Sequence, residues 1–153
     1  MIILDIAMRW LHLMSAIAAA GTTILALFVL VPVLRESPED VRTRLHEVIR
    51  PRMSKLVSIS IGLLLISGFY NYLAVKMPLH EGQGLYHGLM GGKILLAFVV
   101  FFIASALTGK AKAFESLRAQ RAKWLTISVL LVMAIVAIGG VLRLQPETAA
   151  AMP

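Results

Sequence analysis

The stretch WLHLMSAIAAAGTTILALFVLVPVL, residues 10–34, decides the fold. After His12 it contains no ionisable side chain, and the next one is Arg35. A helix needs about 20 apolar residues to cross the hydrocarbon of a bilayer, which is about 30 Å thick. We therefore expect a membrane-spanning helix over about residues 6–34. The run is too long, and lacks the basic start, to be a signal peptide.

Three further apolar runs of similar length follow, at residues 56–75, 85–108 and 124–142. The whole sequence is 59% hydrophobic and only 15% charged, which lies outside the usage of a soluble domain. The charged residues fall between the runs, as expected if the runs lie in lipid. The sequence predicts an all-α fold, an integral membrane four-helix bundle that forms a single transmembrane domain over residues 1–153.

The connection between the first two runs has helical features of its own. Ser37-Pro38-Glu39-Asp40 predicts a helix start, with Ser37 as the N-cap and two acids in the first turn. Apolar residues then recur at helical spacing opposite charged ones, and these are Val41, Leu45, Val48 and Ile49 against Arg42, Arg44, Glu47 and Arg50. We expect a short amphipathic cytoplasmic helix here, which Pro51 separates from the second span.

The basic residues indicate the orientation in the membrane. Eleven of the 15 Lys and Arg residues lie in two connections, as Arg35, Arg42, Arg44, Arg50, Arg52, Lys55, Lys110, Lys112, Arg118, Arg121 and Lys123. Short cytoplasmic loops are enriched in Lys and Arg, so both termini are expected outside, in a bacterial-type inner membrane. The net charge of +7 is therefore a topology signal, and no nucleic-acid partner is expected.

Ionisable residues inside spans are costly, so His12 and Lys93 are the first candidates for a functional site. His87 begins the third span and His80 precedes it on the same side, while Asn71 ends the second span. His12 could ligate haem iron or copper while its other nitrogen bonds a carbonyl or Ser15. Alternatively, His12 is a hydrogen-bonded interhelical histidine and Lys93 extends its ammonium to the membrane surface.

The remaining composition narrows the chemistry. The chain has no cysteine, which excludes disulfides, iron–sulfur clusters and covalent c-type haem. Gly88 and Gly92 form a small-xxx-small pair that permits close helix packing or a flat macrocycle against bare backbone. No nucleophilic triad, carboxylate pair or phosphate-binding loop is recognisable, so hydrolysis and phosphoryl transfer are not expected.

Three short motifs carry a resemblance. Arg9-Trp10-Leu11-His12-Leu13 with Gly21, Leu65-Ile66-Ser67-Gly68, and Gly92-Lys93-Ile94-Leu95-Leu96 occur in order on the first three spans. Together they resemble the superfamily of small four- or five-helix membrane proteins that includes the copper-resistance D domain and HemJ-type protoporphyrinogen oxidase. In HemJ-type proteins a first-helix histidine and a third-helix lysine are associated with b-type haem, and these correspond to His12 and Lys93.

The resemblance favours haem b over copper as the cofactor. The expected function is electron transfer or porphyrinogen-type oxidation, with His12 as axial ligand, His87 as possible second ligand and Lys93 as anion partner. Asn71 is added to the same polar site. Copper binding or transport is one alternative, and a cofactor-free accessory subunit of a membrane complex is another. The expected partners are the lipid bilayer and either further copies of the chain or the other subunits of a complex, and whether the protein is an enzyme is left open.

Overall fold

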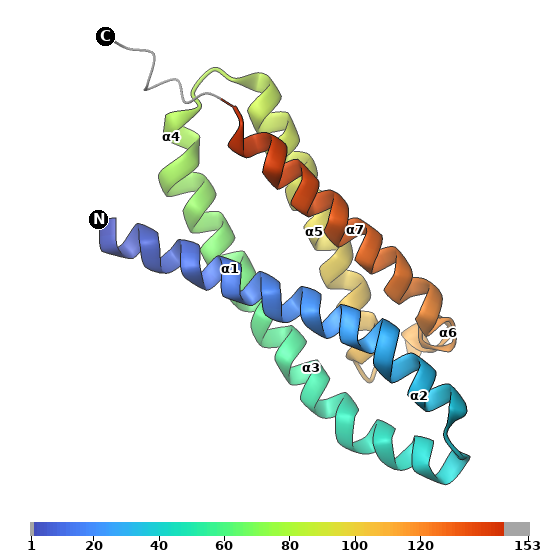
Figure 1. Cartoon of the computed structure of the whole chain (residues 1–153). Helices are drawn as coiled ribbons and strands as arrows, with labels where there is room; N and C mark the ends of the chain where they lie inside the picture. The colour runs from blue at the N-terminus through green and yellow to red at the C-terminus, as the bar shows by residue number, and fades with distance from the viewer. Residues whose placement is uncertain (1, 146–153) are drawn as a thin grey trace.

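A computed structural model describes residues 2–145, and over this range every regular element is helical (Figure 1). The first long helix comprises α1 Ile2–Leu25, the π-helical η1 Ala26–Leu30 and α2 Val31–Glu36. The second comprises α3 Glu39–Tyr70, the π-helical η2 Asn71–Lys76 and α4 Met77–Leu79. The third is α5 Gly84–Thr108 and the fourth is α7 Arg121–Arg143, joined by the short 3₁₀ helix η3 Lys112–Phe114 and α6 Glu115–Ala119.

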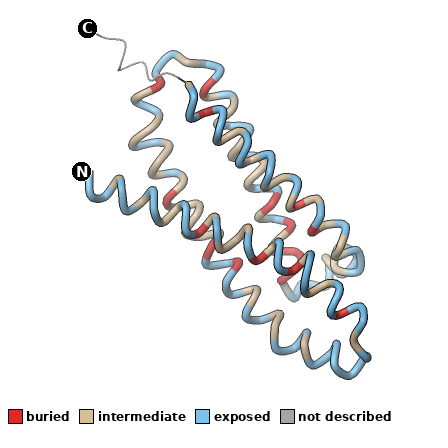
Figure 2. Tube along the Cα trace, viewed as in Figure 1, coloured by how far each residue is buried: buried red, intermediate tan, exposed pale blue. Residues whose placement is uncertain are grey.

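The four long helices are each long and apolar enough to cross a membrane. Their outward faces carry large apolar side chains, among them Phe28 at 66%, Leu95 at 66% and Val136 at 68% exposure. Most of the chain in Figure 2 is exposed or half-buried, with few fully buried positions. Exposure of so much apolar surface to water would be strongly unfavourable, whereas the hydrocarbon of a bilayer solvates it. The fold therefore suggests a multi-pass membrane protein.

Hydroxyl-bearing residues are frequent among the buried positions of the bundle, as is usual for membrane helices. Buried hydroxyls come from all four long helices, and these residues are Ser15, Thr22, Ser60, Ser67, Thr108 and Ser128. Several donate to the backbone carbonyl four residues earlier, for example Thr22 to Ala18 at 2.7 Å and Ser128 to Trp124 at 2.9 Å. Thr22, Ser67, Thr108 and Ser128 are thus satisfied within their own helices, as apolar surroundings require.

Both π-helical segments end just before a proline. Pro32 follows η1, and Pro78 follows η2. Proline has no N–H and its ring clashes with the carbonyl four residues earlier, so a regular α-helix cannot pass through it unchanged. A widened turn accommodates the ring, and each helix continues beyond its proline.

The connection between the first two long helices differs from the expectation. Residues 39–50 are helical, but α3 continues through Pro51 to Tyr70 as one helix, so the expected separation at Pro51 is absent. One missing N–H is tolerated because the flanking turns remain bonded and Arg50 is anchored to the end of α5.

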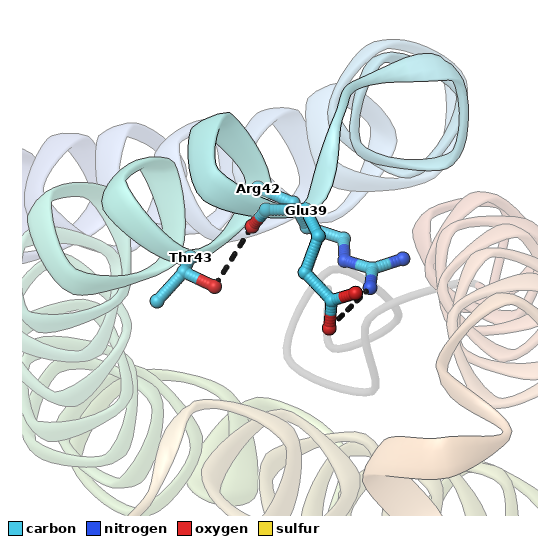
Figure 3. Close-up of polar contacts among 3 residues, drawn as sticks. All are labelled: Glu39, Arg42 and Thr43. Atoms are coloured by element: carbon cyan, nitrogen blue, oxygen red, sulfur yellow. Dashed lines mark hydrogen bonds and ion pairs between the residues drawn. The ribbon is translucent and has the colours of Figure 1, made fainter.

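The predicted N-cap is also wrong. Ser37 donates to Val33 at 2.7 Å, so it caps the end of α2, and the residue that precedes α3 is Pro38. At the start of α3, Arg42 pairs with Glu39 at 3.3 Å and Thr43 donates to the Glu39 carbonyl at 2.9 Å (Figure 3). These local contacts stabilise the first turn in place of a side-chain cap.

The helices pack chiefly as two pairs, α1 with α3 and α5 with α7. The connections at residues 37–38 and 109–120 lie at one end of the bundle, here called the basic end. α1 begins, and α7 ends, at the opposite end, where α4 turns into α5 (Figure 1). The best-packed core, Ala26, Ile103, Leu107 and Leu125, lies in the half next to the basic end.

Candidate functional site

His12 lies on α1, half-buried against α3. Its Nδ1 is 3.1 Å from the hydroxyl of Ser67, which is fully buried at 0% exposure. The Ser67 hydroxyl donates its own hydrogen to the Leu63 carbonyl. Its oxygen is therefore left to accept, which assigns the proton of His12 to Nδ1. The backbone of Leu64 is a second hydrogen-bond partner of the ring. The bond to Ser67 is at Nδ1, so Nε2 is the nitrogen that could bind a ligand.

Gly68 makes the close approach of His12 possible. A Cβ at this position would lie 3.1 Å from Cε1 and 3.4 Å from Nδ1 of His12. The first of these distances is too short for an unstrained contact, so a larger residue would displace the ring. Ser67 and Gly68 thus act together, one holding the imidazole and the other leaving room for it.

Lys93 lies on α5 and extends toward α7. Its Nζ is 3.3 Å from the position that a Cβ of Gly139 would occupy. The ammonium is close enough to His12 to act on it electrostatically. Within the described residues, neither a hydrogen bond nor an ion pair joins Lys93 to another group. It is a half-buried cation, directed into the bundle, that lacks a counter-charge there.

Asn71 and Tyr70 connect the second long helix to α1 on the N-terminal side of His12. The Asn71 side-chain amide donates to the Met8 carbonyl at 3.2 Å, and the Tyr70 hydroxyl donates to Asp5 at 2.7 Å. Met8 lies one turn before His12. Asn71 therefore positions the helix that carries His12, and its side-chain nitrogen is occupied by that role.

His87 belongs to a different cluster, at the turn between α4 and α5. Its Nδ1 is 3.0 Å from the Tyr72 hydroxyl and its Nε2 is 3.0 Å from the His80 carbonyl. The carbonyl can only accept, so Nε2 carries the proton and Nδ1 accepts from Tyr72. Both nitrogens are occupied, so His87 could ligate a metal only by giving up the bond to Tyr72.

His80 completes this cluster. It is 1% exposed, its Nδ1 is 3.0 Å from the Lys76 carbonyl, and its ring stacks on Tyr86 with centroids 3.7 Å apart. These contacts fix the turn that joins the second and third long helices. The cluster accounts for two of the four histidines without invoking a ligand.

Two cavities lie in the half of the bundle next to the basic end, and neither is lined by His12 or Lys93. Among residues 2–145 no group of three or more His, Asp or Glu side chains could hold a metal ion. Haem requires only one protein ligand, because the porphyrin nitrogens supply the equatorial donors, whereas a copper site needs several protein donors.

The sequence predicts His12 and Lys93 in the same half of the bundle, and in the structure they are near enough for the charge of Lys93 to act on His12. It assigned no role to three residues that shape their surroundings, although Ser67 and Gly68 belong to one of the three motifs. A carbonyl or Ser15 was the expected partner of His12, and the structure gives it the Ser67 hydroxyl and the backbone of Leu64. Gly68 and Gly139 leave room for the two ionisable side chains. The glycines on the other spans were the available signal, because a glycine can leave room for an ionisable side chain of a neighbouring helix. The sequence does not show which helices are neighbours, so Gly68 and Gly139 could not be matched with His12 and Lys93. At Gly88 and Gly92, no atom lies within 4 Å of the position that a Cβ would occupy, so no described helix of this chain packs on them.

Comparisons with known proteins assign no family. No protein-family model, no curated protein and no solved structure matches the chain. The function is therefore argued from the geometry of the site.

Proposed function

We propose that the protein is a b-type haem protein of the membrane, with His12 as the axial ligand. The observation that carries the proposal is the hydrogen bond between His12 and Ser67. A metal-ligating histidine donates its second N–H to a neighbouring acceptor, which fixes the tautomer and orients the ring. His12 has this arrangement in a span, where an ionisable side chain is rarely retained without a role.

Lys93 supports the same proposal as an anion partner. The two propionates of haem are carboxylates, and a cation without a counter-charge beside His12 would pair with one of them. This pairing also offsets the cost of keeping an ammonium inside the bundle. When bound, haem would supply one-electron redox chemistry. The chain's own contribution would be to hold the ligand nitrogen, neutralise a propionate and exclude water.

The geometry favours a single histidine ligand from this chain. His87, the possible second ligand, is engaged through both ring nitrogens. His12 lines neither of the two cavities described above, so we propose that space for the macrocycle opens near that residue. The pairs α1–α3 and α5–α7 share fewer contacts with each other than within themselves, so we propose that they part there. The proposal retains the membrane topology, with the basic end in the cytoplasm and both termini outside.

A visible absorption spectrum tests the proposal. The chain is expressed with ample haem and purified in neutral detergent, and the wild-type protein is expected to show a Soret band. His12→Ala should lose the band while remaining folded and monodisperse, because helix insertion depends on apolar length. His46→Ala is the matched control, since His46 is an exposed histidine near the basic end.

Two outcomes would refute the proposal. A folded, monodisperse wild-type protein without colour would favour the cofactor-free accessory subunit. A Soret band that survives in His12→Ala would show that another residue binds the iron.

A further inference from the structure

A second cluster of ionisable side chains lies at the basic end, outside the proposed haem site. Arg50 on α3 donates to the Thr108 carbonyl at 3.3 Å and also to the Gly109 carbonyl. Arg118 on α6 donates to Gly109 at 3.2 Å. Both arginines thus neutralise the negative end of α5, a favourable arrangement for cations.

Arg121, the first residue of α7, is not used in this way. Its Nε is buried and has no hydrogen-bond partner among the described residues. An unsatisfied buried donor costs about 1–3 kcal/mol, and more when the group is charged. Arg121 also lines both cavities of the bundle. The guanidinium therefore borders empty space, and its Nε has donor capacity left over.

The smaller of these cavities combines positive charge with apolar walls. It is partly open to solvent, its empty volume is about 180 Å³ when that open space is included, and Arg50, Arg121 and His46 belong to its lining. These basic groups are close enough to interact electrostatically with one another. The remaining lining residues are apolar, and they are Leu30, Leu34, Leu45, Ile49 and Met53. No carboxylate lines the cavity.

Like charges that converge without a counter-charge repel one another, and the repulsion is larger away from water. We infer that this cavity binds a phosphate-bearing anion, held by Arg121 and Arg50. Guanidinium groups bind phosphate oxygens through parallel N–H donors, which would satisfy Arg121. The N-terminus of the 23-residue helix α7 adds backbone donors on the same side.

The apolar walls favour an anionic phospholipid over free phosphate as the source. Basic pockets between membrane helices on the cytoplasmic side bind anionic lipid headgroups. The amphipathic face of residues 39–50 contributes Leu45 and Ile49 to the same cavity, beside Leu34 of α2. The site therefore gives this segment a role in anchoring a lipid at the end of the bundle.

Thermal unfolding of the full chain in neutral detergent tests the inference, with the fluorescence of Trp10 and Trp124 as the readout. The chain is titrated with phosphatidylglycerol, with phosphatidylcholine and with inorganic phosphate. A ligand that binds only the folded protein raises the unfolding temperature, and the dependence on concentration gives its affinity. Phosphatidylglycerol should raise the temperature, while zwitterionic phosphatidylcholine should not.

The variants identify the site. Arg121→Gln should weaken binding of phosphatidylglycerol about tenfold or more, the loss expected for one charge-assisted hydrogen bond. Arg52→Gln removes the same charge from an exposed position on α3 and should change the affinity by less than about threefold. Arg121→Lys keeps the charge but not the planar fork, so it should bind with intermediate affinity. This variant also serves if Arg121→Gln does not fold.

Each remaining outcome decides the inference. Stabilisation by inorganic phosphate that equals that by phosphatidylglycerol, and that is lost in Arg121→Gln, would support the site with a free anion as its source. Equal weakening by Arg121→Gln and Arg52→Gln would show only a general attraction to the basic end and would overturn the site. Equal stabilisation by the two phospholipids, or none by any anion, would also overturn it.

Discussion

Replacement of Ser67 by alanine isolates the hydrogen bond on which the proposed haem site depends. The variant removes two interactions, the donation from the Ser67 hydroxyl to Leu63 and the acceptance from His12. Side-chain hydrogen bonds between membrane helices contribute on average about 0.6 kcal/mol and at most about 1.7 kcal/mol. The imidazole N–H would also lose its acceptor, which costs about 1–3 kcal/mol when the group stays buried. Because His12 is only half-buried, we expect a total loss of about 1–2 kcal/mol of stability.

Ser128→Ala is the matched control for this variant. Ser128 is equally buried and donates to the carbonyl four residues earlier at 2.9 Å, but no histidine contacts it. The difference between the two variants therefore measures the interaction with His12. The assay is reversible unfolding in detergent, followed by the fluorescence of Trp10 and Trp124. In the presence of haem, Ser67→Ala removes the hydrogen-bond partner of the ligand His12 and should weaken haem retention about 10- to 100-fold, whereas Ser128→Ala should not.

A double-mutant cycle completes the test. With His12 already replaced by alanine, Ser67→Ala should cost no more than Ser128→Ala, because the shared interaction is gone. If Ser67→Ala and Ser128→Ala have the same effect on stability and haem retention in the otherwise wild-type chain, the role assigned to Ser67 is wrong.

The remaining predictions concern packing, topology and the histidine cluster. Gly68→Ala should lower stability by about 1–3 kcal/mol, since its methyl group would crowd the His12 ring. Gly139→Ala should cost less, because its methyl group meets the flexible end of Lys93, and Gly62→Ala and Gly140→Ala, where the space is open, should cost nothing; unfolding in detergent measures all four. Tyr72→Phe should loosen the turn between α4 and α5, seen as faster hydrogen exchange there, but leave the Soret position unchanged; a shifted Soret band would mean that His87 binds the iron. An alkaline-phosphatase fusion should be active at the C-terminus and inactive after Lys112, and the reverse pattern would overturn the topology.

The four long helices could be predicted from the sequence because their signal is local. Each depends only on an uninterrupted apolar length, and the ends at Arg35 and Thr108 are close to those observed. The connection at residues 37–51 was less predictable. Pro51 was expected to separate two helices, but α3 continues through it. The neighbouring turns remain bonded, and Arg50 contacts the end of α5.

The candidate site was only partly predictable, for a related reason. Burying an ionisable group in a span is costly, so His12 and Lys93 can each be recognised as candidates from the sequence of a single span. Their surroundings depend on contacts across the bundle, such as the 55-residue separation between His12 and Ser67. The partners of His87 were not predictable either: its position fits a ligand, and in the structure Tyr72 and the His80 carbonyl bond to its two nitrogens. Spacing alone does not reveal such pairings.

Resonance Raman spectroscopy of the ferrous protein tests whether the iron binds Nε2 of His12. We expect an iron–imidazole stretching band that shifts when the histidines carry ¹⁵N. The band should be present in His87→Ala and absent in His12→Ala. A band that persists in His12→Ala, or one that disappears only in His87→Ala, would contradict the account.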